Sequence, residues 1–461
     1  MRPLVPLILT PVLASCVLGP EPRSPLVELP ASIRGDANRS AGSFGDRAWR
    51  NVFTDPALRS LIERAIKNNP DMVAATYRIE EAEALAGAAR ADWYPRVEGG
   101  AGAITAYNSR NTDQGGSGSG RRSEAFDLTT TLSWELDLWG GIRRSNQAAR
   151  ARLLEAAYLR DAVQTSLIAA VASAYIDLKN LDERLAISRR TAESRGTSLD
   201  LVLTRRDGGV SSDLEVGQAE ALLGQAKVSI PITEQAIAAK ENEIRALIGE
   251  YPGPVARAGS LGRLESRLKI DAGLPSSLLE RRSDVAAASQ NFQAATAEIG
   301  VAEALRLPTL ALTGRGGVVS SDLGELLQGG SGSFSIGPQL AGPLFDAGRS
   351  RAAAKAARAR ASQAAAAYND AAQQAFREAS DALIAHRKSQ EIIAERERLV
   401  GSLRNVSGVA QDRFQGGASS YLEVLDAERS LFDAELDLAD ARRNRLLAVV
   451  QAYRALGGGW K

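Results

Sequence analysis

Apolar and polar residues follow the same succession of spacings twice along this chain. Residues 56–90 and 275–306 place apolar side chains three and four positions apart among many Ala and Glu residues, which predicts helices. Pro95 and Pro308 end these helical patterns, because proline lacks the backbone N–H that a helix interior needs. Apolar and polar side chains then alternate through residues 124–139, which predicts a strand with one apolar face and one fully polar face.

Each half of the chain predicts one pair of strands. We expect them at about 95–108 and about 124–139 in the first half, and at about 308–320 and about 333–345 in the second. The segments that join the two strands of each pair are rich in Gly and polar residues, which is typical of exposed hairpin loops.

Two long stretches without proline follow the strand pairs. Residues 141–206 and 347–414 are rich in Ala, Arg, Leu, Gln and Glu. Each predicts a helix of about 65 residues, which is roughly 100 Å long at about 1.5 Å per residue. A helix of this length needs long neighbours, as in a coiled coil. Residues 213–249 and 421–456 predict the helices that return alongside.

Two similar polar turns connect the long helices to the returning ones. Residues 208–216 read GGVSSDLEV, and residues 416–424 read GGASSYLEV. Other short segments recur at a similar offset, such as Asn69-Pro70-Asp71 and Arg282-Ser283-Asp284. We therefore expect two copies of one unit. The expected parts of the chain are a signal peptide (1–15), a lipidated N-terminal tether (16–48), a first repeat (49–250), a linker (251–273), a second repeat (274–456) and a C-terminal tail (457–461).

The N-terminal residues resemble a bacterial lipoprotein signal. Arg2 precedes a short apolar run that closes with Leu13-Ala14-Ser15-Cys16, the pattern of a lipobox. The resemblance implies cleavage before Cys16 and acylation of its sulfur; an ordinary signal peptide with a free thiol is the alternative. Val17 stands where an aspartate would indicate inner-membrane retention, so we expect the outer membrane.

Charge and composition argue against several kinds of function. The chain has 56 Lys and Arg residues against 55 Asp and Glu residues, so it offers no strongly basic surface for nucleic acid. Cys16 is the single cysteine and His386 the single histidine, which leaves few groups for a metal site or for His-based catalysis. No Gly-rich phosphate loop is present. We expect no enzyme activity, no metal and no cofactor.

Four strands per chain are too few to close on themselves. No stretch approaches the roughly 20 apolar residues of a transmembrane helix, so a membrane-spanning part would consist of strands. An open sheet in lipid leaves the backbone groups of its edges unsatisfied, so closure needs further chains. Two chains would give eight strands and a filled interior, and three would give twelve strands and room for a channel. A soluble sheet lying on a core is the alternative.

Several stretches resemble the TolC-like outer-membrane factors, specifically the NodT-type lipoproteins that serve resistance-nodulation-division efflux pumps. The stretches are residues 49–73, 134–144 (WELDLWGGIRR), 273–308 with its LLERRSDV, and 342–349 (GPLFDAGR). The resemblance implies a mainly α fold with a membrane β-barrel, in which a homotrimer forms a twelve-stranded barrel that continues into a long periplasmic α-helical barrel. It also implies passive export of small molecules, together with a periplasmic membrane-fusion adaptor and an inner-membrane resistance-nodulation-division transporter.

The chemistry of the two turns suits a helical hairpin. Gly209 and Gly417 can adopt the left-handed conformation that ends a helix. One of two serines in each turn can cap the next helix: Ser211 or Ser212, and Ser419 or Ser420. The resemblance implies that both turns lie at the periplasmic end and dock the adaptor. The docking residues are expected to be Arg206, Gly208, Gly209, Ser211, Ser212, Arg413, Gly416, Gly417, Ser419 and Ser420.

The second turn continues into two acidic residues, Glu423 and Asp426, which lie three apart and so on one helix face. The resemblance implies that these carboxylates ring a periplasmic gate; a solvated helix start is the alternative. Some relatives carry a tyrosine and an arginine around this turn, where this chain has Phe414 and Ser419. Closure of the gate would then need other contacts, and a pair between Arg413 and Glu215 is one hypothesis.

Two other functions fit parts of the pattern. The same fold could serve type I protein secretion, although the lipobox and the LLERRSDV stretch favour efflux. A periplasmic coiled-coil scaffold would share the helices and the turns, but it has no use for an alternating strand or for hairpin loops. The exported substrate stays open among antibiotics, dyes, solvents and metal ions.

Overall fold

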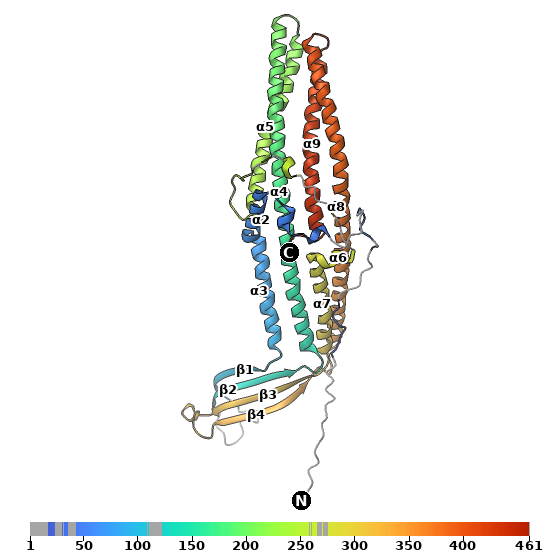
Figure 1. Ribbon diagram of the computed structural model, residues 1–461. Coiled ribbons are helices and arrows are strands. Elements are labelled where there is room, and N and C mark those ends of the chain that lie inside the picture. The colour runs from blue at the N-terminus through green and yellow to red at the C-terminus, as the bar shows by residue number, and fades with distance from the viewer. Residues whose placement is uncertain are drawn as a thin grey trace. The chain divides into compact units, whose positions relative to one another are not determined.

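The computed structural model describes most of the chain (Figure 1). The described residues are 17–23, 30, 32–35, 43–107, 109, 122–257, 259, 261–264, 270 and 275–460. The expected signal peptide and the expected lipidation site, Cys16, lie outside the described residues, as does nearly all of the first hairpin loop.

The two halves of the chain have the same order of elements. After η1 (Phe44–Asp46) and α1 (Trp49–Val52), the first half contains α2 (Pro56–Asn68), α3 (Pro70–Ala91), β1 (Arg96–Tyr107), β2 (Arg122–Leu136), α4 (Gly141–Asp207) and α5 (Asp213–Leu247). The second half contains η3 (Leu261–Leu264), α6 (Pro275–Arg281), α7 (Ser283–Ala304), β3 (Thr309–Ser320), η4 (Leu323–Glu325), β4 (Gly332–Ala341), α8 (Arg349–Gln415) and α9 (Tyr421–Ala455). The long helices α4 and α8 have 67 residues each, and the return helices α5 and α9 have 35 each. None of the described helices holds an apolar stretch long enough to cross a membrane.

The chain divides into two compact units. The first consists of residues 1–25, 80–155 and 288–368, and the second consists of residues 26–79, 156–287 and 369–461. Helices α3, α4, α7 and α8 contribute residues to both units.

The first unit contains a four-stranded antiparallel sheet in the order β1-β2-β3-β4. Its register brings side chains of one kind together on each face. Val97, Leu132, Gly314 and Ile336 form one row across the sheet, and the next row consists of Glu98, Thr131, Arg315 and Ser335. Because neighbouring residues of a strand point to opposite faces, one face is mainly apolar and the other mainly polar. The alternation in the sequence therefore continues across the whole sheet.

Two strands end earlier than their sequence pattern suggests. β2 ends at Leu136 rather than near 139, because the Asp137 carboxylate accepts the N–H groups of Ile142 and Arg143 at 3.0 Å each and so caps the start of α4. β4 likewise ends at Ala341, and the carboxylate of Asp346 accepts the N–H of Ser350 at the start of α8. An aspartate carboxylate thus accepts backbone N–H groups at the start of both long helices.

The N-terminal residues that the structure describes are held against the first unit. The N–H of Leu18 donates to the carbonyl of Trp139 at 3.1 Å. The side chain of Arg144, only 3% exposed, donates to the carbonyls of Leu18 and Gly19 at 3.1 and 3.0 Å. A Cβ on Gly300 would lie 2.6 Å from the carbonyl oxygen of Leu18, so only glycine permits this approach. The expected tether therefore begins with a docked segment instead of a free one.

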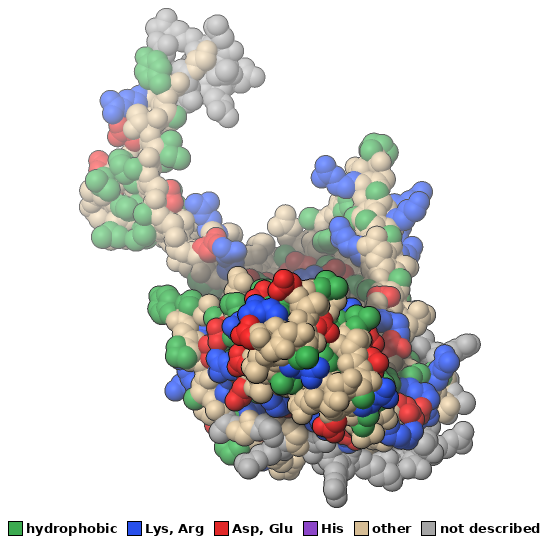
Figure 2. Space-filling model, turned by 90° about the horizontal axis from the view of Figure 1, so that it is seen from above, with side chains coloured by type: hydrophobic (Ala, Val, Ile, Leu, Met, Phe, Trp, Pro, Cys, Tyr) green, Lys and Arg blue, Asp and Glu red, His purple; other side chains and the backbone are tan. Residues whose placement is uncertain are grey.

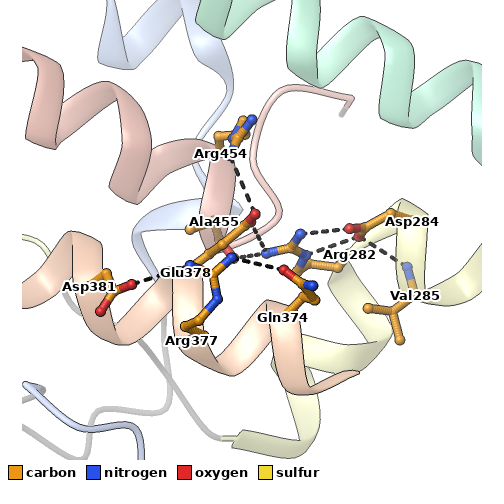
Figure 3. A network of polar contacts seen from close by, with 9 residues as sticks. All are labelled: Arg282, Asp284, Val285, Gln374, Arg377, Glu378, Asp381, Arg454 and Ala455. Carbon is orange, nitrogen blue, oxygen red and sulfur yellow. Dashed lines mark hydrogen bonds and ion pairs between the residues drawn. The ribbon is translucent and has the colours of Figure 1, made fainter. Parts of the chain in front are cut away.

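In the second unit, the starts of α3 and α7 contact a return helix in the same way. The side-chain amide of Asn69 donates to the carbonyl of Leu247, at the end of α5, at 3.0 Å. Arg282 has the matching position in the second half, and its Nη1 donates to the carbonyl of Ala455, at the end of α9, at 3.3 Å (Figure 3). Arg282 also pairs with Glu378 of α8 at 2.8 Å. The duplication therefore extends to individual long-range hydrogen bonds.

The turns at the ends of α4 and α8 lie at the same end of the second unit, beside one another (Figure 1). A hydrophobic cluster fills the space between the four helices there. Its buried members are Val202, Val216, Ala219, Ala410, Phe414, Tyr421, Val424 and Ala427. On the face seen in Figure 2, acidic and basic side chains are intermingled. This mixture agrees with the balanced charge of the sequence.

Candidate functional site

The two repeated turns have the same backbone geometry. Gly209 and Gly417 have φ angles of +78° and +74°, which confirms the left-handed conformation expected from the sequence. The N–H of Val210 donates to the carbonyl of Arg205 at 2.9 Å, and the N–H of Ala418 donates to the carbonyl of Arg413 at 2.8 Å. These bonds satisfy carbonyls that a helix end leaves without partners. Both long helices therefore stop abruptly, within one turn of the glycines.

The helices that follow are capped differently. Ser212 is the N-cap of α5: its hydroxyl accepts the N–H of Glu215 at 3.3 Å, and the Glu215 carboxylate accepts the N–H of Ser212 at 2.9 Å. Ser420 is the N-cap of α9, but its side chain makes no capping hydrogen bond. The hydroxyls of Ser211 and Ser419 are buried without a hydrogen-bond partner. The sequence left the choice between two serines open in each turn. In the first turn the structure selects Ser212, whereas in the second turn Ser420 occupies the N-cap position but neither serine side chain caps α9.

An arginine ties the two turns together. Nη1 of Arg205, in the last turn of α4, donates to the carbonyls of Phe414 and Gln415 at 3.0 and 3.2 Å. Its guanidinium carbon lies 4.7 Å from the centre of the Phe414 ring, within the range of a cation–π contact. Phe414 in turn packs edge-on against Tyr421, with ring centres 5.3 Å apart. Arg205 thus links the end of the first hairpin to the end of the second.

The other arginines beside the turns bind locally. The guanidinium of Arg206 is exposed and donates to the carboxylate of Asp207. The guanidinium of Arg413 donates to the carbonyl of Ala418 in its own turn at 3.4 Å. The guessed pair between Arg413 and Glu215 is not formed within the chain, because Glu215 closes the capping box of α5.

The tip of the first turn exposes apolar side chains. Val210 is 66% exposed and Leu214 is 70% exposed. Leu422, at the start of α9, is exposed as well. The backbones of Gly208, Gly209, Gly416 and Gly417 lie in the exposed part of the turns beside these side chains. The two turns therefore present glycine backbone and small apolar groups, with Arg206 and Arg413 at their edge.

The two expected gate residues lie on the exposed side of α9. Glu423 and Asp426 are both exposed. Asp426 pairs with Arg429 of the same helix at 3.1 Å, so part of its charge is offset within the chain. No group of three or more potential metal ligands occurs among the residues that the structure describes.

A buried ion pair that was not predicted from the sequence lies close to these residues. Arg195 of α4 and Glu428 of α9 are only 1% and 8% exposed, and their Nε and Oε2 atoms are 3.8 Å apart. A signal was present in the sequence: Arg195 is spaced three and seven positions before Ser198 and Val202, on the buried face of its helix. An arginine on that face requires a buried partner.

Comparisons with known proteins agree with this arrangement. A family model described as outer membrane efflux protein matches residues 61–250 and 274–458. The solvent efflux pump outer membrane protein SrpC of Pseudomonas putida is 31% identical over 99% of this chain and 98% of its own length. The probable outer membrane lipoprotein SilC of Salmonella typhimurium is 31% identical over 97% of both chains. The solved structure of the outer-membrane channel OprN has a TM-score of 0.89 and 30% identity, covering 96% of this chain and 100% of that one.

Proposed function

The chain belongs to the outer membrane efflux protein family and is an outer-membrane channel subunit of an efflux pump, and we propose that it works as a homotrimer in a tripartite system. In this system the channel exports small molecules passively. A periplasmic membrane-fusion adaptor joins it to an inner-membrane resistance-nodulation-division transporter, which supplies the energy. No catalytic step is assigned to the chain.

The four-stranded sheet supports a trimer. β1 and β4 are its edge strands, and each has one unpaired side within the chain. An unpaired edge in lipid leaves N–H and C=O groups unsatisfied, at a cost of several kcal/mol per group. Three copies joined edge to edge would form a closed sheet of twelve strands and remove every free edge. Its apolar face would then lie toward lipid and its polar face toward the channel.

The two turns would dock the adaptor. Their glycines bring exposed backbone to the surface, and Val210 and Leu214 add apolar area that the chain itself leaves uncovered. The docking set is Arg206, Gly208, Gly209, Ser211, Ser212, Arg413, Gly416, Gly417, Ser419 and Ser420. Arg205 is not part of this set, since its Nη1 already donates to two carbonyls of the second turn.

Glu423 and Asp426 would form the gate. Three copies of this exposed face around one axis would concentrate six carboxylates, which attract cations and repel one another. The pair between Asp426 and Arg429 would limit this repulsion in the closed channel.

A lipid on Cys16 would anchor the channel to the outer membrane. The docked segment that begins at Val17 supports this, because Arg144 and the carbonyl of Trp139 hold Leu18 in one place.

The observation that carries the proposal is the pair of matching turns with exposed Val210 and Leu214, in a chain of this family. Val210→Glu and Leu214→Glu leave both turn glycines intact but place charge on the docking surface. We expect each variant to assemble in the outer membrane and to abolish efflux in cells that lack the native gene. Tyr251→Glu, which alters an exposed apolar side chain in the linker, is the matched control. Normal drug or metal tolerance in the Val210 and Leu214 variants would contradict adaptor docking at these turns.

A further inference from the structure

A buried polar cluster joins all four helices below the turns. Nη1 of Arg195 on α4 donates to the carbonyl of Leu222 on α5 at 2.8 Å. Nη2 of Arg195 donates to the carbonyl of Glu428 on α9 at 3.4 Å. The guanidinium also lies 5.1 Å from the centre of the Phe432 ring of α9. One side chain of α4 therefore contacts both return helices.

The carboxylate of Glu428 extends the cluster to the remaining helix. Its Oε1 accepts a hydrogen bond from the hydroxyl of Ser198 on α4 at 3.1 Å. That hydroxyl accepts a hydrogen bond from the side-chain amide of Gln411 on α8 at 3.4 Å. Each hydrogen bond has a preferred direction, so the cluster specifies the relative positions of α4, α5, α8 and α9 and does more than fill space.

Stability alone does not explain a charged pair at this place. Burial of two charges costs solvation, and a well-packed apolar pair of similar volume is often at least as stable. Nε of Arg195 and Oε2 of Glu428 are buried without a hydrogen-bond partner, which adds to the cost. Burial also lowers the pKa of Arg195, although Glu428 acts in the opposite direction. A cluster of this kind is better suited to fixing one arrangement of the helices.

The position of the cluster suggests which arrangement it fixes. Glu428 lies two residues after Asp426, on the helix that carries both proposed gate residues. Arg195 lies ten residues before Arg205, on the helix that ends in the first docking turn. We propose that Arg195 and Glu428 are positioning residues of the gate, which hold the gate-bearing helix α9 to α4 and α5. A displacement of the first turn, at the end of α4, then moves the gate-bearing helix α9 together with it. This inference rests on the proposed channel function.

Two variants and one control test it. Arg195→Met leaves the Glu428 carboxylate buried without its cation. The double variant Arg195→Met, Glu428→Leu removes both charges and keeps apolar volume. Arg190→Met is the matched control. Arg190 lies on the same helix and also pairs with an acid of α9, Glu435, but the Arg190 side chain itself is exposed and Arg404 pairs with the same acid.

The measurements are thermal unfolding of the purified full-length protein and single-channel recording in planar bilayers. We expect Arg195→Met to lower the unfolding midpoint and to raise the fraction of time open at least about fivefold. The double variant should recover the midpoint of the unmodified chain and still open too often, because apolar packing restores stability without directed hydrogen bonds. The control should match the unmodified chain in both respects.

The outcomes separate the inference from the function on which it rests. A double variant that closes as well as the unmodified chain would overturn the inference, because the cluster would then contribute stability only. The double variant also keeps the test decisive if Arg195→Met alone fails to fold. Absence of any channel activity in the unmodified chain would instead contradict the proposed function, whatever the unfolding midpoints are.

Discussion

The bond between the two turns can be tested by removing the side chain of Arg205. Arg205→Ala deletes two hydrogen bonds to the carbonyls of Phe414 and Gln415 and one contact with the Phe414 ring. The backbone of the second turn keeps its own hydrogen bonds, since Gly417 and Ala418 donate to carbonyls of α8. The variant should therefore fold, with a second turn that opens more often.

The size of the effect follows from the contacts that are lost. A hydrogen bond from a charged donor contributes about 1.5 kcal/mol at the low end of its range, and the ring contact about 0.5 kcal/mol at an exposed site. The bond to Gln415 lies in an exposed part of the turn, so we assign it no contribution to the total. We expect a loss of about 2 kcal/mol in local stability, which corresponds to roughly thirtyfold faster opening.

Amide hydrogen exchange measures this opening directly. The N–H groups of Gly417 and Ala418 should exchange roughly thirtyfold faster in Arg205→Ala than in the unmodified chain. Arg206→Ala is the control, because Arg206 pairs with Asp207 at the surface of its own turn; there the same amides should change by less than about twofold. Equal exchange rates in Arg205→Ala and the unmodified chain would show that Arg205 does not hold the second turn.

Three further predictions concern other parts of the chain. Burial raises the pKa of Glu428, although Ser198 and Arg195 act in the opposite direction. The contribution of this group to stability is therefore fully present below the ordinary glutamate pKa and is lost as pH rises through the raised value. Relative to Glu428→Gln, the unmodified chain should unfold at a higher temperature at a pH below the ordinary glutamate pKa than at alkaline pH, and a difference that does not change with pH would contradict this. Glu423→Ala and Asp426→Ala should each change single-channel conductance and weaken block by divalent cations, and unchanged recordings would reject the gate. Arg144→Ala should free the N-terminal segment for proteolysis between residues 17 and 23 while mass spectrometry still detects the lipid on Cys16; Arg150→Ala, an exposed arginine of the same helix, should not, and equal cleavage of the two variants would argue against docking.

Much of the architecture follows from the sequence because it depends on local chemistry. Helix and strand periods repeat in the same order in both halves, and apolar and polar residues alternate along β2 with the period that a two-faced sheet requires. Gly209 and Gly417 could be placed in left-handed turns because few other residues adopt a positive φ without strain. The resemblance to outer-membrane factors supplied the family, which the comparisons confirm.

The tertiary structure decided which distant groups meet. Asp137 reads as the last polar residue of an alternating strand, but its carboxylate caps α4 and so ends β2. Arg205 stands beside Arg206 at the polar end of its helix, yet it binds carbonyls of residues more than 200 positions later in the chain. The spacing of Arg195 places it on the buried face of its helix, but nothing in the sequence identifies Glu428 as its partner, because only the packing of four helices brings the two together. Periodicity reports the environment of a residue along its own helix, whereas a long-range partner depends on how the helices are set against one another.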